Sequence, residues 1–403
     1  TIFLFLFCAL FQIIHSQDKS PYTLLISLDG VRYDFDKNDS LPNFNFIKEN
    51  GVKANSLTPV FPTLSLPNLF SLLSGLYPIN HGIIANTFKD PIKNDFYTTR
   101  IKGAREQNKW YIGETFWETA KRQGIITADI NSIFPRLSDK NKIADFYIEF
   151  NSDSSYWQRI DEGLNFLTIN YAERPNFLHF YFEDVDLKSH IFGVNSKEVN
   201  NSYHLFDSLI GYILTKLKTM NLYDSTNIII VSEHGDMDID SNNTINLDNI
   251  LSGIRYELQN YGTFAMIDGR KTVLQEIFDS LKLHSVNYDV YFREDLPKHF
   301  NFSNHPYISP IILIAKPGWV MSDNSLENKT ISLKAVNGYD NNVIDMHGIF
   351  YAMGPSFSKN YEVETINIID IYPILCHIHR IIPRNNIDGS FERVKNILKD
   401  LNE

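Results

Sequence analysis

The sequence has little cysteine: two of its 403 residues, Cys8 and Cys376. Cys8 falls within an apolar run at the N-terminus, so a chain processed after that run keeps Cys376 alone. A single cysteine cannot form an internal disulfide, and such a chain must be stabilised by its buried core. Cys376 lies in the apolar run from Ile368 to Ile382, where we expect it to be a buried small hydrophobic residue.

Clustered positive charge is also missing. The formal net charge is -11, from 37 Lys and Arg against 48 Asp and Glu, and no long block of like charge interrupts the chain. A nucleic-acid duplex is bound by clustered Lys and Arg, so we expect no duplex partner. A small anionic substrate held by metal ions stays compatible with this charge. The 43% of hydrophobic and 13% of aromatic residues predict a large globular core.

No apolar run reaches the ~20 residues that a membrane-spanning helix needs. The N-terminal run from Ile2 to Ile14 is interrupted only by Gln12, and polar residues follow from His15. This pattern predicts a signal peptide over residues 1–16 and a secreted chain over 17–403 without a membrane anchor. A buried N-terminal strand or helix is the alternative interpretation.

Five Asn-X-Ser/Thr triplets agree with secretion, because they are acceptor sites for N-linked glycans. The five are Asn38, Asn200, Asn242, Asn301 and Asn328. In a chain this rich in asparagine such triplets also arise by chance, so each is weak evidence by itself.

Strand-like and helix-like segments alternate along the chain. The β-type runs are Thr23–Leu28, Phe177–Phe182 and Asn227–Val231, and segments with helical spacing include Phe116–Arg122 and Tyr203–Met220. The alternation predicts an α/β sandwich with a largely parallel central sheet and helices on both faces. Residues 240–330 are richer in turn residues, and we expect an inserted lobe there within one catalytic domain.

Acidic, imidazole and hydroxyl side chains collect where the predicted strands end, the usual place for a site in an α/β sheet. The clusters are Asp29, the pair Asp186 and His190, the pair Glu233 and His234, and the turn Pro62–Asn68. Asp and His four residues apart share one helical face and can bind one metal ion. Mixed His and carboxylate ligands suit zinc, and two centres ~4 Å apart suit phosphoryl transfer. Singly, a strand-end Asp is also a common helix cap, and an Asp-x-x-x-His pair is also common on surfaces.

Longer motifs make the pattern specific. They are Ser27–Asp34, Pro59–Asn68, Gly75–Pro78, His81–Ile83 with Asn86, Asp186–His190, Val231–Gly235 and Gly338–Asn341. In these residues and in their order, the chain resembles the ectonucleotide pyrophosphatase/phosphodiesterase family of the alkaline phosphatase superfamily. The resemblance covers roughly residues 20 to 395. It implies an alkaline-phosphatase-like fold and a site for two zinc ions.

The resemblance also implies roles for single residues. Ser65 would be the nucleophile that forms a phosphoserine, a position that is Thr in most members, and Asn86 would donate its amide to a substrate oxygen. One zinc ion would be held by Asp29, Ser65, Glu233 and His234, and the other by Asp186 and His190. A hydroxyl that caps the following helix is the alternative role for Ser65, and the two roles are compatible.

Two departures from the family pattern concern metal ligands. Glu233 stands where the family has Asp, which keeps a carboxylate one methylene further out. Asn337 stands where the family has a zinc-binding His, and a neutral amide is a poor zinc ligand. His347, ten residues further on, is a candidate substitute, although we expect it to pack in the core.

The substrate pocket also differs from the family pattern. Nucleotide-binding members place the base between two aromatic rings, and here the first of these positions is Leu66. Phe150, before Asn151, is a candidate for the second ring, or else a core residue. One ring gives about half of the stacking, which is worth ~1–3 kcal/mol per base.

The sequence therefore predicts a secreted, zinc-dependent phosphoric diester hydrolase. Its expected substrate is a small phosphodiester, either a nucleotide or a choline or lysolipid headgroup. A homologue without efficient turnover, acting as a binding or decoy protein, is the alternative, because Asn337 replaces a zinc ligand. A phosphomonoesterase on the same scaffold ranks below both, because no extra cationic contacts to a terminal phosphate are visible.

Overall fold

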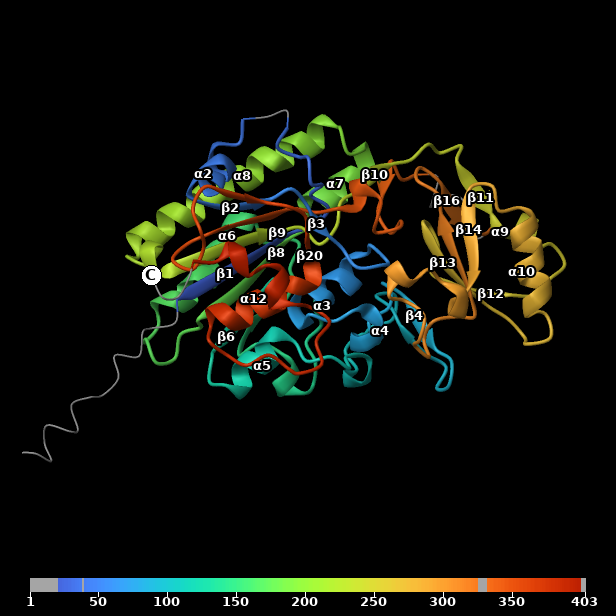
Figure 1. Ribbon diagram of the computed structural model, residues 1–403, viewed down its shortest axis with the longest axis horizontal. Coiled ribbons are helices and arrows are strands. Elements are labelled where there is room, and N and C mark those ends of the chain that lie inside the picture. Colours follow the sequence, from blue (N-terminus) through green and yellow to red (C-terminus); the bar gives the residue numbers. More distant parts are fainter. Residues whose placement is uncertain (1–20, 38–39, 325–331, 400–403) are drawn as a thin grey trace, which may run out of the picture.

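A mixed sheet of eight strands forms the centre of the main body in the computed structural model, which describes residues 21–37, 40–324 and 332–399 (Figure 1). In spatial order the strands are β19 (Tyr361–Val363), β2 (Gly51–Ala54), β18 (Phe350–Met353), β9 (Thr226–Val231), β1 (Tyr22–Leu28), β8 (Phe177–Phe182), β6 (Thr127–Ile130) and β7 (Phe146–Ile148). Strands β9, β1, β8, β6 and β7 pair in parallel, whereas β18 runs antiparallel to both of its neighbours. The predicted α/β fold with a largely parallel sheet is confirmed.

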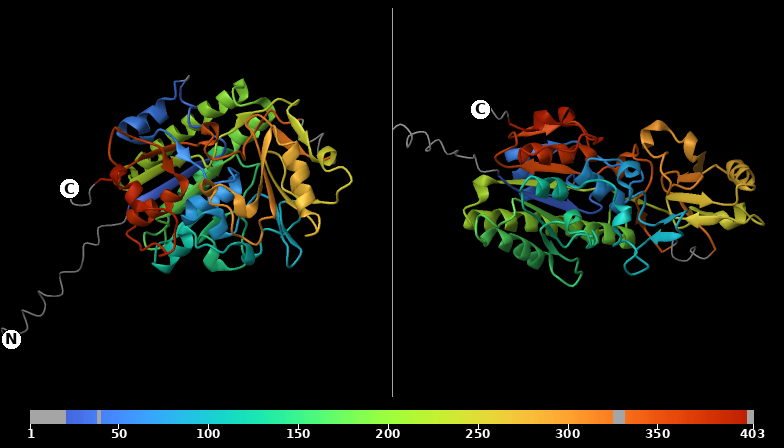
Figure 2. Two further views of the ribbon diagram at one scale, coloured as in Figure 1. Left: turned by 45° about the vertical axis from the view of Figure 1, so that its right-hand side comes forward. Right: turned by 90° about the horizontal axis from the view of Figure 1, so that it is seen from below.

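Helices cover both faces of this sheet, as the view from below shows (Figure 2). One layer contains α2 (Pro42–Asn50), α6 (Tyr156–Asn165) and α8 (Lys197–Thr219), and the other contains α3 (Ser65–Ser74), α5 (Phe116–Arg122) and α12 (Ile371–Ile378). Alternate residues of a strand face opposite layers. In β1, Leu24 and Ile26 pack with the first layer, and Leu25 packs with the second.

The helix expected over Tyr203–Met220 is longer than its apolar spacing indicated. It is α8, which begins at Lys197 because the Ser196 side chain accepts a hydrogen bond from the backbone N–H of Val199. A serine in this position satisfies one of the free N–H groups of the first turn.

In α12, Cys376 is fully buried and unpaired, and burial raises the pKa of its thiol to about 12.

A second sheet lies beside the main body, on the right of Figure 1. Its order is β12 (Glu257–Gln259), β13 (Phe264–Asp268), β15 (Ile311–Ala315) and β14 (Tyr288–Phe292), and α10 (Leu274–Leu283) packs against β14. Ala265, Ile277 and Leu313 belong to a core cluster of their own on this side of the molecule. The chain between β9 and β18 thus contains a lobe with a separate core.

A short antiparallel pair connects this lobe to the edge of the main sheet where β9 ends. Strands β10 (Met237–Asp238) and β17 (Ala335–Val336) pair with Met237 opposite Val336. Continuing this register by one residue places Asp236 opposite Asn337. The segment that follows β9 and the segment that leaves the lobe therefore meet at one point.

Candidate active site

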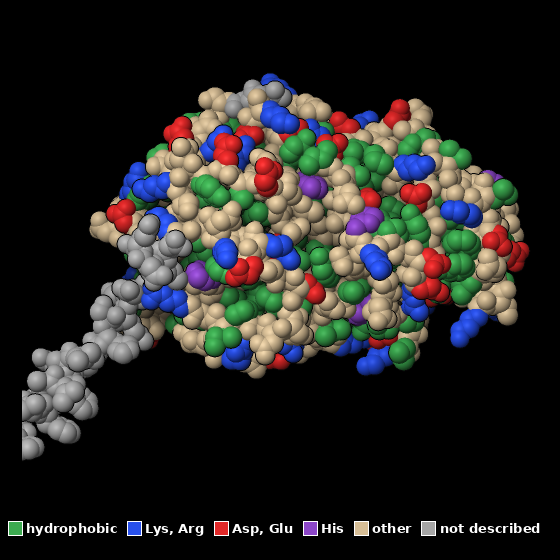
Figure 3. Space-filling view, viewed as in Figure 1, with side chains coloured by type: hydrophobic (Ala, Val, Ile, Leu, Met, Phe, Trp, Pro, Cys, Tyr) green, Lys and Arg blue, Asp and Glu red, His purple; other side chains and the backbone are tan. Residues whose placement is uncertain are grey.

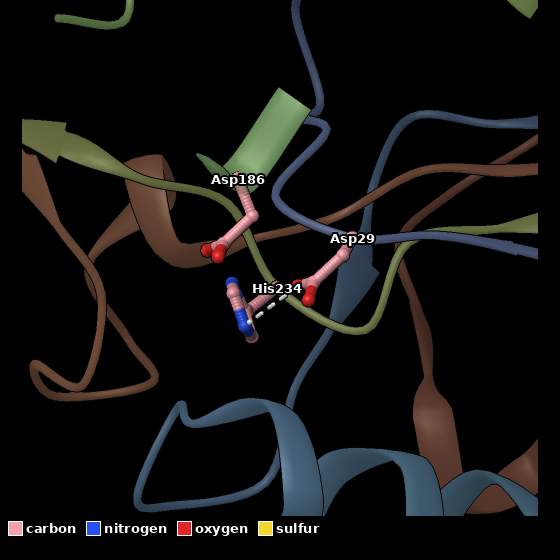
Figure 4. A group of neighbouring side chains, drawn as sticks. All are labelled: Asp29, Asp186 and His234. Atoms are coloured by element: carbon pink, nitrogen blue, oxygen red, sulfur yellow. Dashed lines mark ion pairs between the residues drawn. The ribbon is translucent and has the colours of Figure 1, made fainter. Parts of the chain in front are cut away.

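Three neighbouring strands deliver the acidic and imidazole residues to one edge of the sheet. Asp29 follows β1, and His234 follows β9, its parallel neighbour. On the other side, β8 leads into α7 (Asp184–Phe192), which carries Asp186. Because parallel strands end at the same edge, these three side chains converge, and Figure 4 shows them pointing toward one another.

Gly30 allows the turn after β1 to approach the helix that carries Asp186. The backbone N–H of Asp186 donates to the carbonyl of Asp29 at 3.2 Å. Gly30 has φ +75, and a Cβ added there would lie 2.8 Å from the Cα of Asp186 and 2.9 Å from its Cβ. The absence of a side chain at residue 30 is thus what brings the two carboxylates together.

We expect Gly30→Ala to weaken metal binding and to lower the free energy of unfolding by at least ~2 kcal/mol, because positive φ and the contact with Asp186 both oppose a side chain. Gly103→Ala is the matched control, since Gly103 has φ +77 and nothing within 4 Å of an added Cβ. Zinc titration and chemical denaturation of both variants measure the difference. Equal losses in the two variants would show that the contact with Asp186 is unimportant.

The first group of candidate ligands surrounds the Nε2 atom of His234. The Ser65 Oγ lies 3.1 Å from this nitrogen, and the Asp29 Oδ1 lies 3.3 Å from it. Two ligands of one zinc ion in tetrahedral coordination, with bonds of about 2.0–2.1 Å, lie ~3.4 Å apart. The spacing of these three side chains therefore suits a shared metal ion.

The tautomer of His234 supports the same interpretation. Its Nδ1 faces the carbonyl of Gly235 at 3.2 Å, and since a carbonyl only accepts, the proton belongs on Nδ1. Burial lowers the pKa of this imidazole to about 4, so the ring is neutral and its Nε2 lone pair faces Ser65 and Asp29. In a Ser-His-Asp triad the carboxylate would instead accept from the other ring nitrogen. The arrangement suits a metal ligand rather than a triad.

Buried carboxyl oxygens without a donor provide the second sign of a cation site. The Asp29 Oδ1 and both oxygens of Glu233 are buried and accept no hydrogen bond from the described residues, while the Tyr181 hydroxyl donates to the Asp29 Oδ2. Burial raises the pKa of the Asp29 carboxyl to about 6. Burial, and then the charge of Asp29, raise the pKa of Glu233 well above its ordinary value. Ionised carboxylates without donors are stable in a protein interior only beside a cation.

The second group of candidate ligands lies on α7. The His190 Nε2 is 3.3 Å from the Asp186 Oδ1, and the His190 Nδ1 donates to the carbonyl of Ala335 at 2.8 Å. A ring nitrogen fixed in this way leaves the other nitrogen oriented for a metal. Burial alone would lower the pKa of His190, but the charges of Asp186 and Asp236 raise it to about 9. A divalent ion at this position would replace that proton.

Asn337 lies between the two groups. Its Nδ2 is 3.3 Å from the Asp186 Oδ1 and 3.3 Å from the His234 Nε2. Its backbone carbonyl accepts a hydrogen bond from the Thr263 hydroxyl of the lobe at 2.6 Å. The structure therefore places residue 337 where the resemblance requires a ligand, with an amide in place of an imidazole.

Asp236 joins the second group, and the sequence prediction did not include it. One oxygen of its carboxylate lies within 4.8 Å of ligand atoms of Asp186 and His190. The sequence did indicate this residue, because Asp236 is an acid two positions after His234 and follows the same strand-like run. Glu233 is buried beside Asp29. Among the described residues, however, its carboxylate is not part of either set of side chains whose ligand atoms all lie within 4.8 Å of one another.

Ser65 stands at the first position of α3 and is held by the turn before it. The buried Asn68 side chain donates to the carbonyls of Val60, Pro62 and Leu64. The residue that caps the helix is Leu64, without a side-chain hydrogen bond, so the capping role considered for Ser65 is not what the structure shows. The hydroxyl instead faces His234 at the N-terminus of a helix, where the partial positive charge favours a phosphate group.

Asn86 lies against the same turn. Its Oδ1 accepts from the backbone N–H of Leu66 at 3.2 Å, which leaves the amide NH₂ group to donate to a substrate oxygen.

Leu66 is buried in the core cluster of its layer. The ring of Phe150 is partly exposed and lies 5.3 Å from the guanidinium of the buried Arg159. The roles expected for Leu66 and Phe150 in substrate binding remain predictions.

A groove of about 680 Å³ begins at Asn86 and runs between the main body and the lobe. Its lining includes Phe96 and Arg100 from one side and Tyr261 from the other, and Arg100 donates to the Tyr261 hydroxyl at 3.0 Å. Aromatic rings and a guanidinium suit an anionic ligand with a planar group. Elsewhere on the face shown in Figure 3, basic and acidic side chains are interspersed.

His347 does not replace the missing ligand. Its Nδ1 is 2.9 Å from the Ser56 Oγ, and its Nε2 is 3.1 Å from the carbonyl of Asn341. Both ring nitrogens are therefore engaged outside the site, and burial lowers the pKa of this imidazole.

The remaining sequence predictions concern secretion. Residues 1–16, Asn38 and Asn328 lie outside the described residues. Asn242 is exposed in a turn, Asn200 lies in the first turn of α8, and Asn301 follows a short 3-10 helix. Among the helices of the described chain, none combines the length and the apolar character needed to cross a membrane.

Comparison with known proteins decides the family. The model of the type I phosphodiesterase/nucleotide pyrophosphatase family matches residues 23–340. The chain is 32% identical to human ectonucleotide pyrophosphatase/phosphodiesterase family member 5 over 95% of its length and 79% of that protein's. It is 33% identical to human bis(5'-adenosyl)-triphosphatase ENPP4, over 96% and 83%. The chain belongs to the ectonucleotide pyrophosphatase/phosphodiesterase family.

Solved structures agree with this family assignment. Human ectonucleotide pyrophosphatase/phosphodiesterase 5 superposes with a TM-score of 0.89 at 31% identity, over 94% of this chain and all of that one. An inactive threonine-to-alanine variant of the murine protein, in complex with AMP, superposes with a TM-score of 0.88 at 29% identity, over the same shares of the two chains. The predicted family is confirmed, and the prediction of a phosphoric diester hydrolase is confirmed at the level of the family.

Proposed function

We propose that this protein hydrolyses small phosphodiesters through a phosphoserine intermediate on Ser65. The observation that carries the proposal is the position of the Ser65 hydroxyl, 3.1 Å from the neutral imidazole of His234. Asp29 and Asn337 lie at the same ring nitrogen, and Asn337 also contacts Asp186. A hydroxyl in a cluster of metal-ligand side chains, at a helix N-terminus, suits nucleophilic attack on phosphorus.

Two zinc ions are the proposed cofactors. Asp29, Ser65 and His234 would hold one, with Glu233 beside them, and Asp186 and His190 would hold the other. When bound, a pair of zinc ions supplies Lewis acidity to both the attacking and the leaving oxygen. The orphaned buried oxygens of Asp29 and Glu233 support a cation at this place.

The protein's own residues supply attack, orientation and hydrogen bonds. The Ser65 Oγ attacks phosphorus and gives up its proton to solvent, while the bond to the leaving oxygen breaks and that alcohol departs with a proton. The phosphoryl group stays on Ser65 with its remaining ester until water cleaves the bond between phosphorus and the Ser65 Oγ, which releases a monoester and restores the hydroxyl. The Asn86 NH₂ group donates to a non-bridging oxygen, and the hydrogen bond from Leu66 to its Oδ1 holds it in that orientation.

A nucleotide is the substrate class that the observations favour. The groove beside Asn86 offers the rings of Phe96 and Tyr261 and the charge of Arg100. A murine relative is described in complex with AMP, and another relative is named a bis(5'-adenosyl)-triphosphatase. A choline or lysolipid headgroup is the competing class, because Leu66 is not aromatic.

The test compares hydrolysis of the p-nitrophenyl ester of thymidine 5'-monophosphate with hydrolysis of p-nitrophenylphosphocholine, in the zinc-loaded protein. We expect a higher kcat/KM for the nucleotide. In Arg100→Gln that preference should fall while kcat/KM for the choline ester stays constant. A higher kcat/KM for the choline ester would move the assignment to that class.

A binding or decoy protein is the second candidate function, and Asn337 is the observation that favours it. Acid quench of the reacting protein, followed by mass spectrometry, distinguishes the two. In the hydrolase, the peptide that contains Ser65 carries the phosphoryl group still esterified to the nucleoside or to choline. A zinc-loaded protein that binds AMP but neither forms this phosphopeptide nor turns over either ester would be the decoy.

Secretion is proposed from residues 1–16 and from the five glycan acceptor triplets. Asn242 is the acceptor that is exposed in a turn. Expression in eukaryotic cells should release glycosylated protein into the medium, with a mobility that increases after glycosidase treatment.

A further inference from the structure

The centre formed by Asp186 and His190 lacks a third strong ligand if only the residues named by the family pattern are counted. Asn337 presents its amide to Asp186, and an amide binds zinc weakly. His347, the substitute suggested by the sequence, is engaged elsewhere through both ring nitrogens. An ion at this centre therefore needs another side chain to complete its coordination.

Asp236 is the one further acid or imidazole side chain that meets the spacing of a ligand at this centre within the described residues. One oxygen of its carboxylate lies within 4.8 Å of ligand atoms of both Asp186 and His190. The side chain is fully buried, and its Oδ1 has no hydrogen-bond partner. Its Oδ2 accepts from the hydroxyl of Ser189, which lies on α7 between the two other ligands.

The strand pairing explains why this residue reaches the place of the missing imidazole. Strands β10 and β17 are antiparallel with Met237 opposite Val336, so Asp236 and Asn337 are the next pair in the same register. Residues directly opposite in such a pair have Cβ atoms about 4.5–5.5 Å apart. A ligand lost on one strand can therefore be replaced by a ligand on the facing strand without moving the backbone.

Electrostatics makes a purely structural role for Asp236 unfavourable. Its free Oδ1 is buried, and its carboxylate lies within ligand spacing of the Asp186 carboxylate and the His190 imidazole. Burying a charged carboxylate with one oxygen unpartnered is costly unless a cation binds it. Ser189 orients the carboxylate through its other oxygen, as residues behind a metal ligand usually do.

We propose that Asp236 is a metal ligand that replaces the missing imidazole at residue 337, giving a centre of Asp186, His190 and Asp236. The proposal rests on the proposed two-metal function and adds a ligand to it. Asn337 then becomes a positioning residue, whose amide donates to Asp186. The donor set of two carboxylates and one imidazole is one that zinc accepts.

The test measures zinc stoichiometry and affinity by competition with a chromophoric chelator, together with the rise in melting temperature on adding zinc. Wild type should bind two ions. Asp236→Asn keeps the shape and the contact with Ser189, and should weaken the second ion by at least ~10²-fold while leaving the first. Asp238→Asn, two residues further along the chain in β10 and exposed, should behave as wild type.

Two variants at residue 337 complete the test. Asn337→Ala should retain the second ion, because the amide is not a ligand. This measurement is informative even if Asp236→Asn fails to fold. The double variant Asp236→Asn, Asn337→His should recover the second ion, because an imidazole returns on the facing strand.

Two results would overturn the assignment of Asp236. If Asp236→Asn binds both ions with wild-type affinity, Asp236 is not a ligand, while the proposed function stands. If Asn337→Ala loses the second ion, the amide is the ligand instead. A wild type that binds fewer than two ions would overturn the two-metal function itself, which is a distinguishable outcome.

Discussion

Ser65→Ala is expected to lower kcat/KM for phosphodiesters by at least ~10³-fold, because the variant removes the atom that bonds to phosphorus in the proposed mechanism. The fold should be unaffected, since the Ser65 hydroxyl is not the cap of α3 and the turn is held by Asn68. Binding of AMP to the zinc-loaded variant should persist, because the remaining ligands and Asn86 stay in place. Steady-state kinetics and calorimetric titration with AMP measure the two effects.

Ser65→Thr is the matched control for that prediction. It keeps a hydroxyl on the same carbon, and the family resemblance places threonine at this position in most members. Activity within about tenfold of wild type is expected, since the γ-methyl group changes the local packing alone. Retained turnover in Ser65→Ala would place the nucleophile elsewhere and refute the phosphoserine intermediate.

Asp186→Asn is expected to remove the second of the two proposed metal ions and to lower kcat by ~10²-fold or more, since even residues behind a metal ligand are worth ~10–100-fold. Asp186 lies within ligand spacing of Asp29 and His234 and also within ligand spacing of His190 and Asp236. Asparagine has the same shape and removes the charge. Metal analysis of the purified variant and steady-state kinetics measure the change.

Asp184→Asn provides the control on the same helix. The Asp184 carboxylate accepts from the Ser202 hydroxyl and the Lys188 ammonium, and it takes no part in either ligand group of the described residues. This variant should lose some stability and keep both metal ions. If it loses metal to the same degree as Asp186→Asn, the effect would come from a general disturbance of α7.

The sequence was sufficient to predict the sheet and the convergence of acidic and imidazole side chains at one of its edges, for physical reasons that the structure makes plain. The apolar runs of β1, β8 and β9 are buried on both faces, and each ends in a polar group that the sheet brings to one edge. Asp29 and His234 therefore converge because their strands are parallel neighbours. The site follows from strand order, and strand order follows from the α/β pattern.

Other features depended on contacts that no local pattern encodes. The approach of Asp236 to Asn337 requires the pairing of β10 with β17, which are about a hundred residues apart in the chain and two residues long each. The groove beside Asn86 requires Tyr261 of the lobe to face Arg100. Such placements come from the packing of the lobe against the main body, whereas periodicity reports only on each segment.

The location of bound zinc tests the central claim most directly. In crystals of the zinc-loaded protein, diffraction recorded at the zinc absorption edge should show two anomalous peaks, one between Asp29, Ser65 and His234 and one beside His190. The protein in solution should contain two zinc ions per chain. If protein incubated with excess zinc fails to retain stoichiometric metal and its crystals show no anomalous peak at this cluster, the account is contradicted.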